Sequence, residues 1–180
     1  MATKKTAKKA AKNLVTSPAR PGKFYTGSMG EHYVMAELLA RGFNVSRAVV
    51  DEGIDVIAFK PDNPQKLFRI QVKTAFSGGG VKAKKFTFTL GTAAYEQAAG
   101  QDYYLVLVMR DDVNDLFVAA VIPKQIFDDY RENQNVIDWN TQSTSMQVAV
   151  HLHTNGSITL KNVGGLDITS QTKNRWDRIN

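Results

Sequence analysis

The spacing of apolar residues predicts one helix near the start of the folded part of the chain. Apolar positions recur every three or four residues between Val34 and Leu39, which is the period of a helix with one buried face. Ser28 precedes this pattern and Gly42 follows it, and both are residue types that commonly flank helices. We therefore expect a helix over residues 28–41.

Three short runs rich in β-branched and aromatic residues follow. They are FNVSRAVV (43–50), GIDVIAFK (53–60) and KLFRIQVK (66–73), and they are separated by DEG and by PDNP. Prolines with Asp and Asn between them are typical of a turn. Because links this short favour neighbouring strands that run in opposite directions, the three runs predict an antiparallel meander.

The second half of the chain adds further strands and helices. DYYLVLVMR (102–110) is almost continuously apolar, which is typical of a central strand buried on both faces, and DLFVAAVI (115–122) is expected to pair back on it. The chain is therefore expected to form an α/β sheet with helices on at least one side. The other expected elements are a strand at 85–90, a helix at 92–100, a helical piece after Pro123 and a hairpin of 145–153 with 157–161.

The composition suits one globular domain. The chain has 180 residues, of which 43% are apolar, and this is enough for a real hydrophobic core. No run approaches the roughly 20 apolar residues of a membrane-spanning helix, so no membrane association is expected, and the N-terminal stretch lacks the apolar segment of a secretory signal. The absence of cysteine excludes disulfides, thiolate metal sites and cysteine nucleophiles, and it fits a cytoplasmic location.

The net charge of +6 comes from one end of the chain. Residues 1–23 contain seven Lys and Arg residues and no acid, whereas residues 24–180 contain 16 basic and 17 acidic residues. Because TKKTAKKAAKN has no large apolar side chain, we expect a disordered basic arm at 1–23 and a single domain at 24–180. Such an arm attracts phosphate backbones without reading sequence; the alternative is a tail that serves only solubility. The lysines of the arm expected to contact nucleic acid are Lys4, Lys5, Lys8 and Lys9.

Three polar features stand out in the first half, each with an ordinary structural explanation. Asp55 lies in the apolar strand GIDVIAF, where a buried carboxylate needs a partner or a cation, although a half-exposed strand would also explain it. Gln71 and Lys73 leave the same face of one strand, which is also the pattern of a solvated face. Glu31 completes Ser28-x-x-Glu31, a capping box that needs no function.

The three features together favour a shared site. The turn before the third strand makes the second and third strands neighbours, and counting from it brings Asp55 level with Gln71 or Lys73. A carboxylate, an amide carbonyl and an ammonium then converge, and the first turn of the preceding helix could reach the same place. Oxygen ligands without Cys or paired His suit a hard cation such as Mg²⁺. A lysine beside such a cation suits phosphoryl transfer.

These residues, in this order, resemble the PD-(D/E)xK nuclease superfamily. GSMGEHYVMAELLARGFNV, GIDVIAF and RIQVKT correspond to its helix glutamate, to the aspartate of its second strand and to the (E/Q)xK of its third strand. The pattern looks closest to archaeal-type Holliday junction resolvases and to QxK-type group I intron homing endonucleases. The resemblance implies a restriction-endonuclease-like α/β core of a helix, a three-strand antiparallel meander, a helix and a buried strand, with extra C-terminal strands.

The resemblance also implies an activity. The chain would be a metal-dependent endonuclease that hydrolyses DNA with a metal-activated water and leaves a 5′-phosphate and a 3′-hydroxyl. Its cation would be Mg²⁺, for which Mn²⁺ can substitute, and Lys73 would position the attacking water and offset developing charge. The metal ligands would be Asp55, the Gln71 side-chain carbonyl, the Val72 backbone carbonyl and Glu31, the last directly or through water.

Two departures from the family pattern bear on activity. Ile54 stands where the motif has proline, and the neutral Gln71 stands where it commonly has an acid. One negative charge fewer is expected to weaken metal binding. A catalytically inactive nucleic-acid-binding module on the same fold is therefore the alternative, and a structural or partner-binding protein is a third class.

The nuclease interpretation also predicts DNA contacts and assembly. A flexible basic loop follows the third strand, and its lysines would hold the backbone of duplex or branched DNA beside the site. One active site per chain cuts one strand, so we expect a homodimer or homotetramer. The lysines of this loop are Lys82, Lys84 and Lys85.

Overall fold

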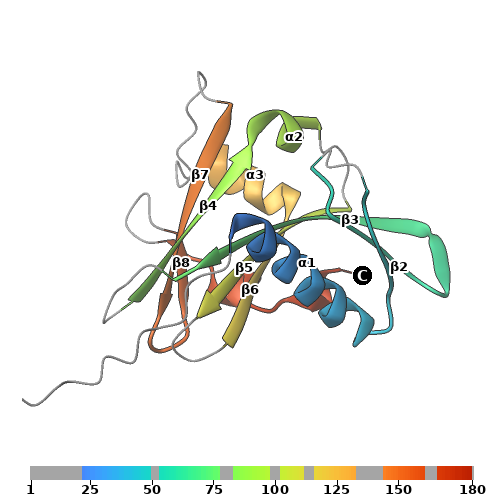
Figure 1. Ribbon diagram of the computed structural model, residues 1–180, viewed down its shortest axis with the longest axis horizontal. Helices are drawn as coiled ribbons and strands as arrows, with labels where there is room; N and C mark the ends of the chain where they lie inside the picture. Colours follow the sequence, from blue (N-terminus) through green and yellow to red (C-terminus); the bar gives the residue numbers. More distant parts are fainter. Residues whose placement is uncertain are drawn as a thin grey trace, which may run out of the picture.

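The protein forms three layers, with a helix on one face of a five-stranded sheet and a second, four-stranded sheet on the other (Figure 1). The computed structural model describes residues 22–49, 53–77, 83–97, 102–111, 116–132, 144–160 and 166–179. Apart from Gly22 and Lys23, the expected basic arm at 1–23 lies outside the described residues, and so do Lys4, Lys5, Lys8, Lys9 and Lys82.

The five-stranded sheet contains the expected meander. Its strands are β1 (Asn44–Arg47), β2 (Val56–Lys60), β3 (Asn63–Phe76), β5 (Tyr103–Asp111) and β6 (Leu116–Pro123). β1, β2 and β3 pair antiparallel in chain order, which confirms the prediction. β5 lies parallel to β3 and β6 pairs antiparallel with β5, so the buried strand β5 lies inside the sheet, between β3 and the edge strand β6. The turn between β2 and β3 is tighter than predicted, because Lys60 pairs with Asn63.

The helix on this sheet, α1 (Lys23–Leu39), begins earlier than its apolar pattern suggests. The predicted range of 28–41 misses the first turn, because Phe24 and Tyr25 are exposed and leave no apolar stripe to detect. The helix ends at Leu39, ahead of Gly42, whose φ of +80° suits glycine. Within the described residues, no helix is long and apolar enough to span a membrane.

The earlier start of α1 removes one structural explanation for Glu31. Gly22 is the N-cap, and Ser28 therefore lies inside the helix, where its backbone carbonyl oxygen is 2.7 Å from His32 Nδ1. The capping-box interpretation of Ser28 and Glu31 is wrong, because the box requires the serine to stand at the N-cap.

The second sheet consists of β4 (Ala83–Gly91), β7 (Ser145–His153), β8 (Ile158–Leu160) and β9 (Leu166–Asp167). The hairpin of β7 and β8 confirms the prediction, and Gly156 in its turn has a φ of +82°. The remaining elements are α2 (Thr92–Gln97), α3 (Lys124–Glu132), α4 (Thr169–Thr172) and the 3₁₀-helix η1 (Trp176–Arg178).

Two hydrophobic clusters hold the layers together. One lies between the two sheets and includes Leu105 and Leu107 of β5 with Phe86 and Phe88 of β4. The other lies between α1 and the five-stranded sheet, where Val34 and Leu38 meet Phe68, Ile70 and Val72. Each fully buried side chain of this size stabilises the fold by about 1.5–3 kcal/mol. Because alternate strand residues face opposite sides, the odd-numbered residues of β3 point away from α1.

Candidate active site

Asp55 fixes the point where β2 separates from β3. Its backbone N–H donates to the Ile70 carbonyl at 2.9 Å, and its own carbonyl accepts from the Ala48 N–H at 3.0 Å. The Asp55 side chain then accepts a hydrogen bond at 2.6 Å from the N–H of Val72. The Asp55 carboxylate thus takes the place of the carbonyl oxygen that a longer β2 would offer to the Val72 N–H. Hydrogen bonds to β3 and to Ala48, which follows β1, hold Asp55 in place.

Gln71 lies on β3 level with Asp55. The β2–β3 register pairs Val56 with Ile70, which places Gln71, one of the two residues that the sequence predicts there, opposite Asp55. Gln71 is only 2% exposed, and its Oε1 is buried without a hydrogen-bond partner in the described part of the chain. A buried amide oxygen without a partner costs about 1–3 kcal/mol, so it is suited to a ligand that completes the site.

The backbone of Val72 adds a second carbonyl at the same place. The N–H of Val72 points toward Asp55, and the N–H and C=O of one strand residue leave the same edge of the strand. Beyond Ile70, β3 has no β2 partner. The Val72 carbonyl therefore faces the side that β2 leaves uncovered.

Glu31 approaches this end of the sheet from α1 but has a basic partner. Its Oε2 is 2.6 Å from Arg47 Nε, and the side chains are 15% and 47% exposed respectively. The two groups form an ion pair without hydrogen-bond alignment, since Oε2 has no such partner among the described residues. Arg47 pairs with Val56 in the β1–β2 register, one residue from Asp55. Sequence reasoning missed Arg47, because a polar residue on a short edge strand gives no distinctive signal.

A close contact between α1 and β3 positions Glu31. A Cβ on Gly30 would lie 1.7 Å from Thr74 Oγ1, so the helix can approach the strand only because residue 30 is glycine. Thr74 Oγ1 is itself buried and has no hydrogen-bond partner within the described ranges. Neither residue stands out in the sequence, since their contact depends on tertiary packing.

Tyr103 supports the loop before Asp55. Its ring is buried, and its hydroxyl donates to the Gly53 carbonyl at 2.7 Å. Gly53 has a φ of +82°, a conformation that glycine adopts without strain. The rings of Tyr103 and Tyr104, like that of Trp176, are buried and pack in the core rather than offering a surface for base stacking. Burial raises the pKa of the Tyr104 hydroxyl, which donates to the Arg178 carbonyl.

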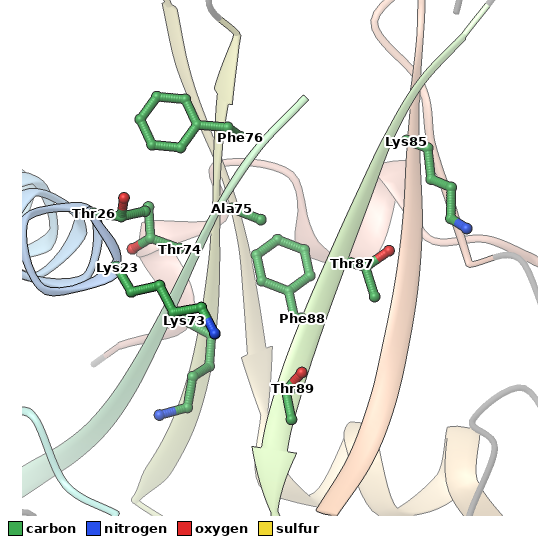
Figure 2. A pocket seen from close by; sticks show the side chains of 10 residues that line it. All are labelled: Lys23, Thr26, Lys73, Thr74, Ala75, Phe76, Lys85, Thr87, Phe88 and Thr89. Carbon is green, nitrogen blue, oxygen red and sulfur yellow. The ribbon is translucent and has the colours of Figure 1, made fainter. Parts of the chain in front are cut away.

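Lys73 extends into a groove beside these residues. The groove has a volume of about 620 Å³ and lies between the end of β3, the first turn of α1 and β4 (Figure 2). Lys85 also lines it, whereas Lys84 forms an ion pair with the buried Asp111 in a separate pocket. The two lysines diverge because neighbouring residues of β4 point to opposite faces.

The structure thus brings some of the candidate residues together and separates others. Asp55, Gln71 and Val72 converge, Lys73 is next to them on β3, and Glu31 lies on the α1 side of the sheet. No group of three or more His, Cys, Asp or Glu side chains able to hold a metal occurs among the described residues. A metal here would have to use amide and backbone carbonyl oxygens beside the carboxylates, which are ligands that hard cations accept.

Comparisons with known proteins give two similar solved structures. A bacterial homing endonuclease matches with 16% sequence identity and a TM-score of 0.44, over 74% of this chain and 77% of that chain. A Holliday junction resolvase from the archaeon Archaeoglobus fulgidus matches with 16% identity and a TM-score of 0.41, over 80% of this chain and 93% of that chain. These are the two kinds of nuclease that the motifs resemble. No family model and no curated protein matches the chain.

Proposed function

We propose that this chain is a metal-dependent DNA endonuclease that hydrolyses phosphodiester bonds at the site around Asp55. One relationship carries the proposal: the Val72 N–H holds the Asp55 carboxylate, and the preceding residue of β3, Gln71, has a buried side-chain oxygen without a hydrogen-bond partner among the described residues. A polar arrangement that served only stability would satisfy that oxygen. The helix Glu, strand Asp and QxK order supports the same conclusion.

The residues present fit a hard divalent cation. Asp55 supplies negative charge, Gln71 and Val72 supply neutral carbonyl oxygens, and Glu31 is available if its ion pair with Arg47 opens. We propose Mg²⁺, with Mn²⁺ as a substitute. When bound, such a cation acts as a Lewis acid that lowers the pKa of water and offsets charge on the phosphate.

The side chains of this chain would each have one task in the reaction. Asp55 and Gln71 bind the cation, and the rigid attachment of Asp55 to β1 and β3 keeps their separation constant. Lys73 orients the attacking water and offsets the charge that develops on the phosphate. Water attacks phosphorus, the bond to the 3′-oxygen breaks, and that oxygen leaves as a hydroxyl after gaining a proton. The other product end is a 5′-phosphate.

A nucleic-acid-binding module without hydrolytic activity is the second candidate. The ion pair of Glu31 with Arg47 favours it, because the pair withdraws one carboxylate from the site. The neutral Gln71 favours it too. In that case DNA binding would persist without metal, and no metal would produce cleavage.

The proposal extends to assembly, the basic arm and location. Each chain would carry one site, so cutting both strands needs at least a homodimer or homotetramer. Lys4, Lys5, Lys8 and Lys9 would add sequence-independent contacts with duplex or branched DNA. The absence of cysteine supports a cytoplasmic location.

Incubation with supercoiled plasmid and with a four-way junction, each with Mg²⁺ or Mn²⁺, tests the function. Asp55→Ala and Lys73→Ala should both lose cleavage while they remain folded. Cleavage that persists in both variants would refute the site. If Asp55→Ala changes only the stability of a protein that neither binds nor cuts DNA, the cluster is structural.

A further inference from the structure

The groove that contains Lys73 has an unusual lining. Its walls come from the first turn of α1, the end of β3 and the exposed face of β4. Three lysines, four threonines and three apolar residues line it, and none of these described lining residues is acidic. The lining residues are Lys23, Thr26, Lys73, Thr74, Ala75, Phe76, Lys85, Thr87, Phe88 and Thr89.

The lysines of this groove differ from other lysines of the protein. Lys66, Lys84 and Lys124 each form an ion pair with an aspartate. No ion pair joins Lys23, Lys73 or Lys85 to an acidic side chain in the described part of the chain. Their positive charges are therefore not balanced locally, and together they favour an anionic ligand.

Buried and exposed residues alternate along β4, and the exposed ones form the polar wall of the groove. Its even-numbered residues, Phe86 and Phe88, are buried between the sheets, while Lys85, Thr87 and Thr89 are exposed. In Figure 2, Lys23 and Lys73 extend into the same end of the groove, and Lys85 leaves the outer side of β4. The exposed residues of β4 thus line the groove on the side opposite Lys23 and Lys73.

The adjoining edge of β3 supplies backbone groups as well. Among the described residues, β2 pairs with β3 only as far as Ile70, so Lys73 and Thr74 lie beyond the end of this pairing. β4 is likewise an edge strand of its sheet. Backbone N–H groups and hydroxyls are common contacts for phosphate oxygens.

We propose that this groove binds the sugar–phosphate backbone of one DNA strand next to the site, independently of metal and of base sequence. Lys23 and Lys85 are its phosphate contacts beyond the catalytic set. The wall from Lys85 to Thr89 spans about 13 Å, which corresponds to the rise of about four nucleotides. Asn and Gln, which read adenine, and Arg, which together with Lys reads guanine, are not among its described lining residues. This inference rests on the proposed function for the identity of the ligand.

Fluorescence anisotropy with labelled DNA in EDTA measures DNA binding by the groove separately from cleavage. All proteins in this assay carry the Asp55→Asn substitution, which disables hydrolysis, and two duplexes of unrelated sequence are the probes. Lys23→Ala combined with Lys85→Ala should reduce the slope of log K against log salt by about 1.8, since each phosphate contact contributes about 0.9. The loss should be equal for both duplexes. Lys66→Ala on the distant part of β3 is the control and should leave the slope unchanged.

A second pair of variants keeps the lysines and changes the charge of the wall. Thr87→Glu places a carboxylate on the exposed face of β4 and should weaken binding at least tenfold at low salt, whereas Thr87→Gln should bind like the parent. Equal DNA binding by the two Thr87 variants, or DNA binding unchanged by loss of Lys23 and Lys85, would contradict the binding of DNA in this groove. The proposed hydrolysis at Asp55 would not be affected by that result. If DNA binding depends on the groove residues but the wild-type protein never cleaves DNA, the groove proposal holds and the proposed hydrolytic activity is wrong.

Discussion

The Asp55 carboxylate accepts a hydrogen bond from the Val72 N–H, and this bond joins β2 to β3 where their backbone pairing ends. The side chain therefore has a structural role as well as the proposed role in metal binding. The two roles can be separated, because the structural one needs only an acceptor oxygen, whereas the metal needs negative charge.

Asp55→Asn and Asp55→Ala should consequently differ in stability. The asparagine retains an oxygen for the Val72 N–H, and its free energy of unfolding should stay close to that of the wild type. The alanine leaves the Val72 N–H without its partner and should lose about 1–3 kcal/mol. Urea unfolding of the three proteins measures the difference, and equal stability of the alanine variant would contradict the role of this bond.

Gln71→Leu should separate stability from function at the neighbouring residue. Leucine removes a buried oxygen that has no partner among the described residues, so the free energy of unfolding should be unchanged or should rise by about 1 kcal/mol. Cleavage and the stabilisation of the protein by Mn²⁺ should both be lost. The conservative control is Gln71→Glu, which should bind Mn²⁺ more tightly than the wild type. If Gln71→Leu lowers stability and leaves Mn²⁺ binding intact, Gln71 is not a ligand.

Arg47→Gln should make Glu31 available to the metal. The substitution removes the charge that pairs with Glu31 and should tighten Mn²⁺ binding on the order of tenfold, or about 1.4 kcal/mol. The cost in stability should be about 1 kcal/mol or less, because Arg47 is half exposed. Calorimetric titration with Mn²⁺ measures the affinity. Arg47→Lys keeps the positive charge and should leave the Mn²⁺ affinity unchanged. Equal Mn²⁺ affinity of the Gln and Lys variants would show that Glu31 is outside the metal site.

Gly30→Ala should be destabilising, although alanine is the better helix former. The new Cβ would meet Thr74 Oγ1 at 1.7 Å, and overpacking of this kind typically costs about 1–3 kcal/mol. Thr74→Ala alone should cost little, since that hydroxyl has no hydrogen-bond partner in the described structure. Thermal unfolding of both single variants and the double variant forms a cycle, in which the double variant should recover part of the loss. Additive losses would contradict the contact.

The sequence predicts the meander, and it predicts Asp55 level with Gln71 or Lys73, because both depend on local rules. Strand alternation assigns faces, and the short turn makes β2 and β3 neighbours. The exact register could not be counted from the turn, because the pairing shifts between Ala58 and Lys60. The same reasoning fails at the start of α1, where Phe24 and Tyr25 remain exposed and break the helical stripe.

Contacts between distant segments are the part that the sequence does not reveal. β4 reads as an ordinary alternating strand, and nothing in that pattern indicates that it joins a second sheet with β7. The pairing of Arg47 with Glu31 and the contact of Gly30 with Thr74 likewise depend on how α1 packs on the sheet. The resemblance to PD-(D/E)xK nucleases implies a proposed set of ligands by motif, but it does not predict the basic partner of Glu31.

The most direct test of the proposed activity is the rate of four-way-junction cleavage as Mg²⁺ is titrated, for the wild type and for Asp55→Asn. The proposed mechanism predicts no cleavage in EDTA, a rate that rises and saturates with Mg²⁺ in the wild type, and a loss of at least about 100-fold, or 2.7 kcal/mol, in the folded variant. Product ends should be 5′-phosphate and 3′-hydroxyl. Wild-type protein that binds the junction but leaves it intact at every Mg²⁺ and Mn²⁺ concentration, or an Asp55→Asn variant that cleaves at the wild-type rate, would contradict it.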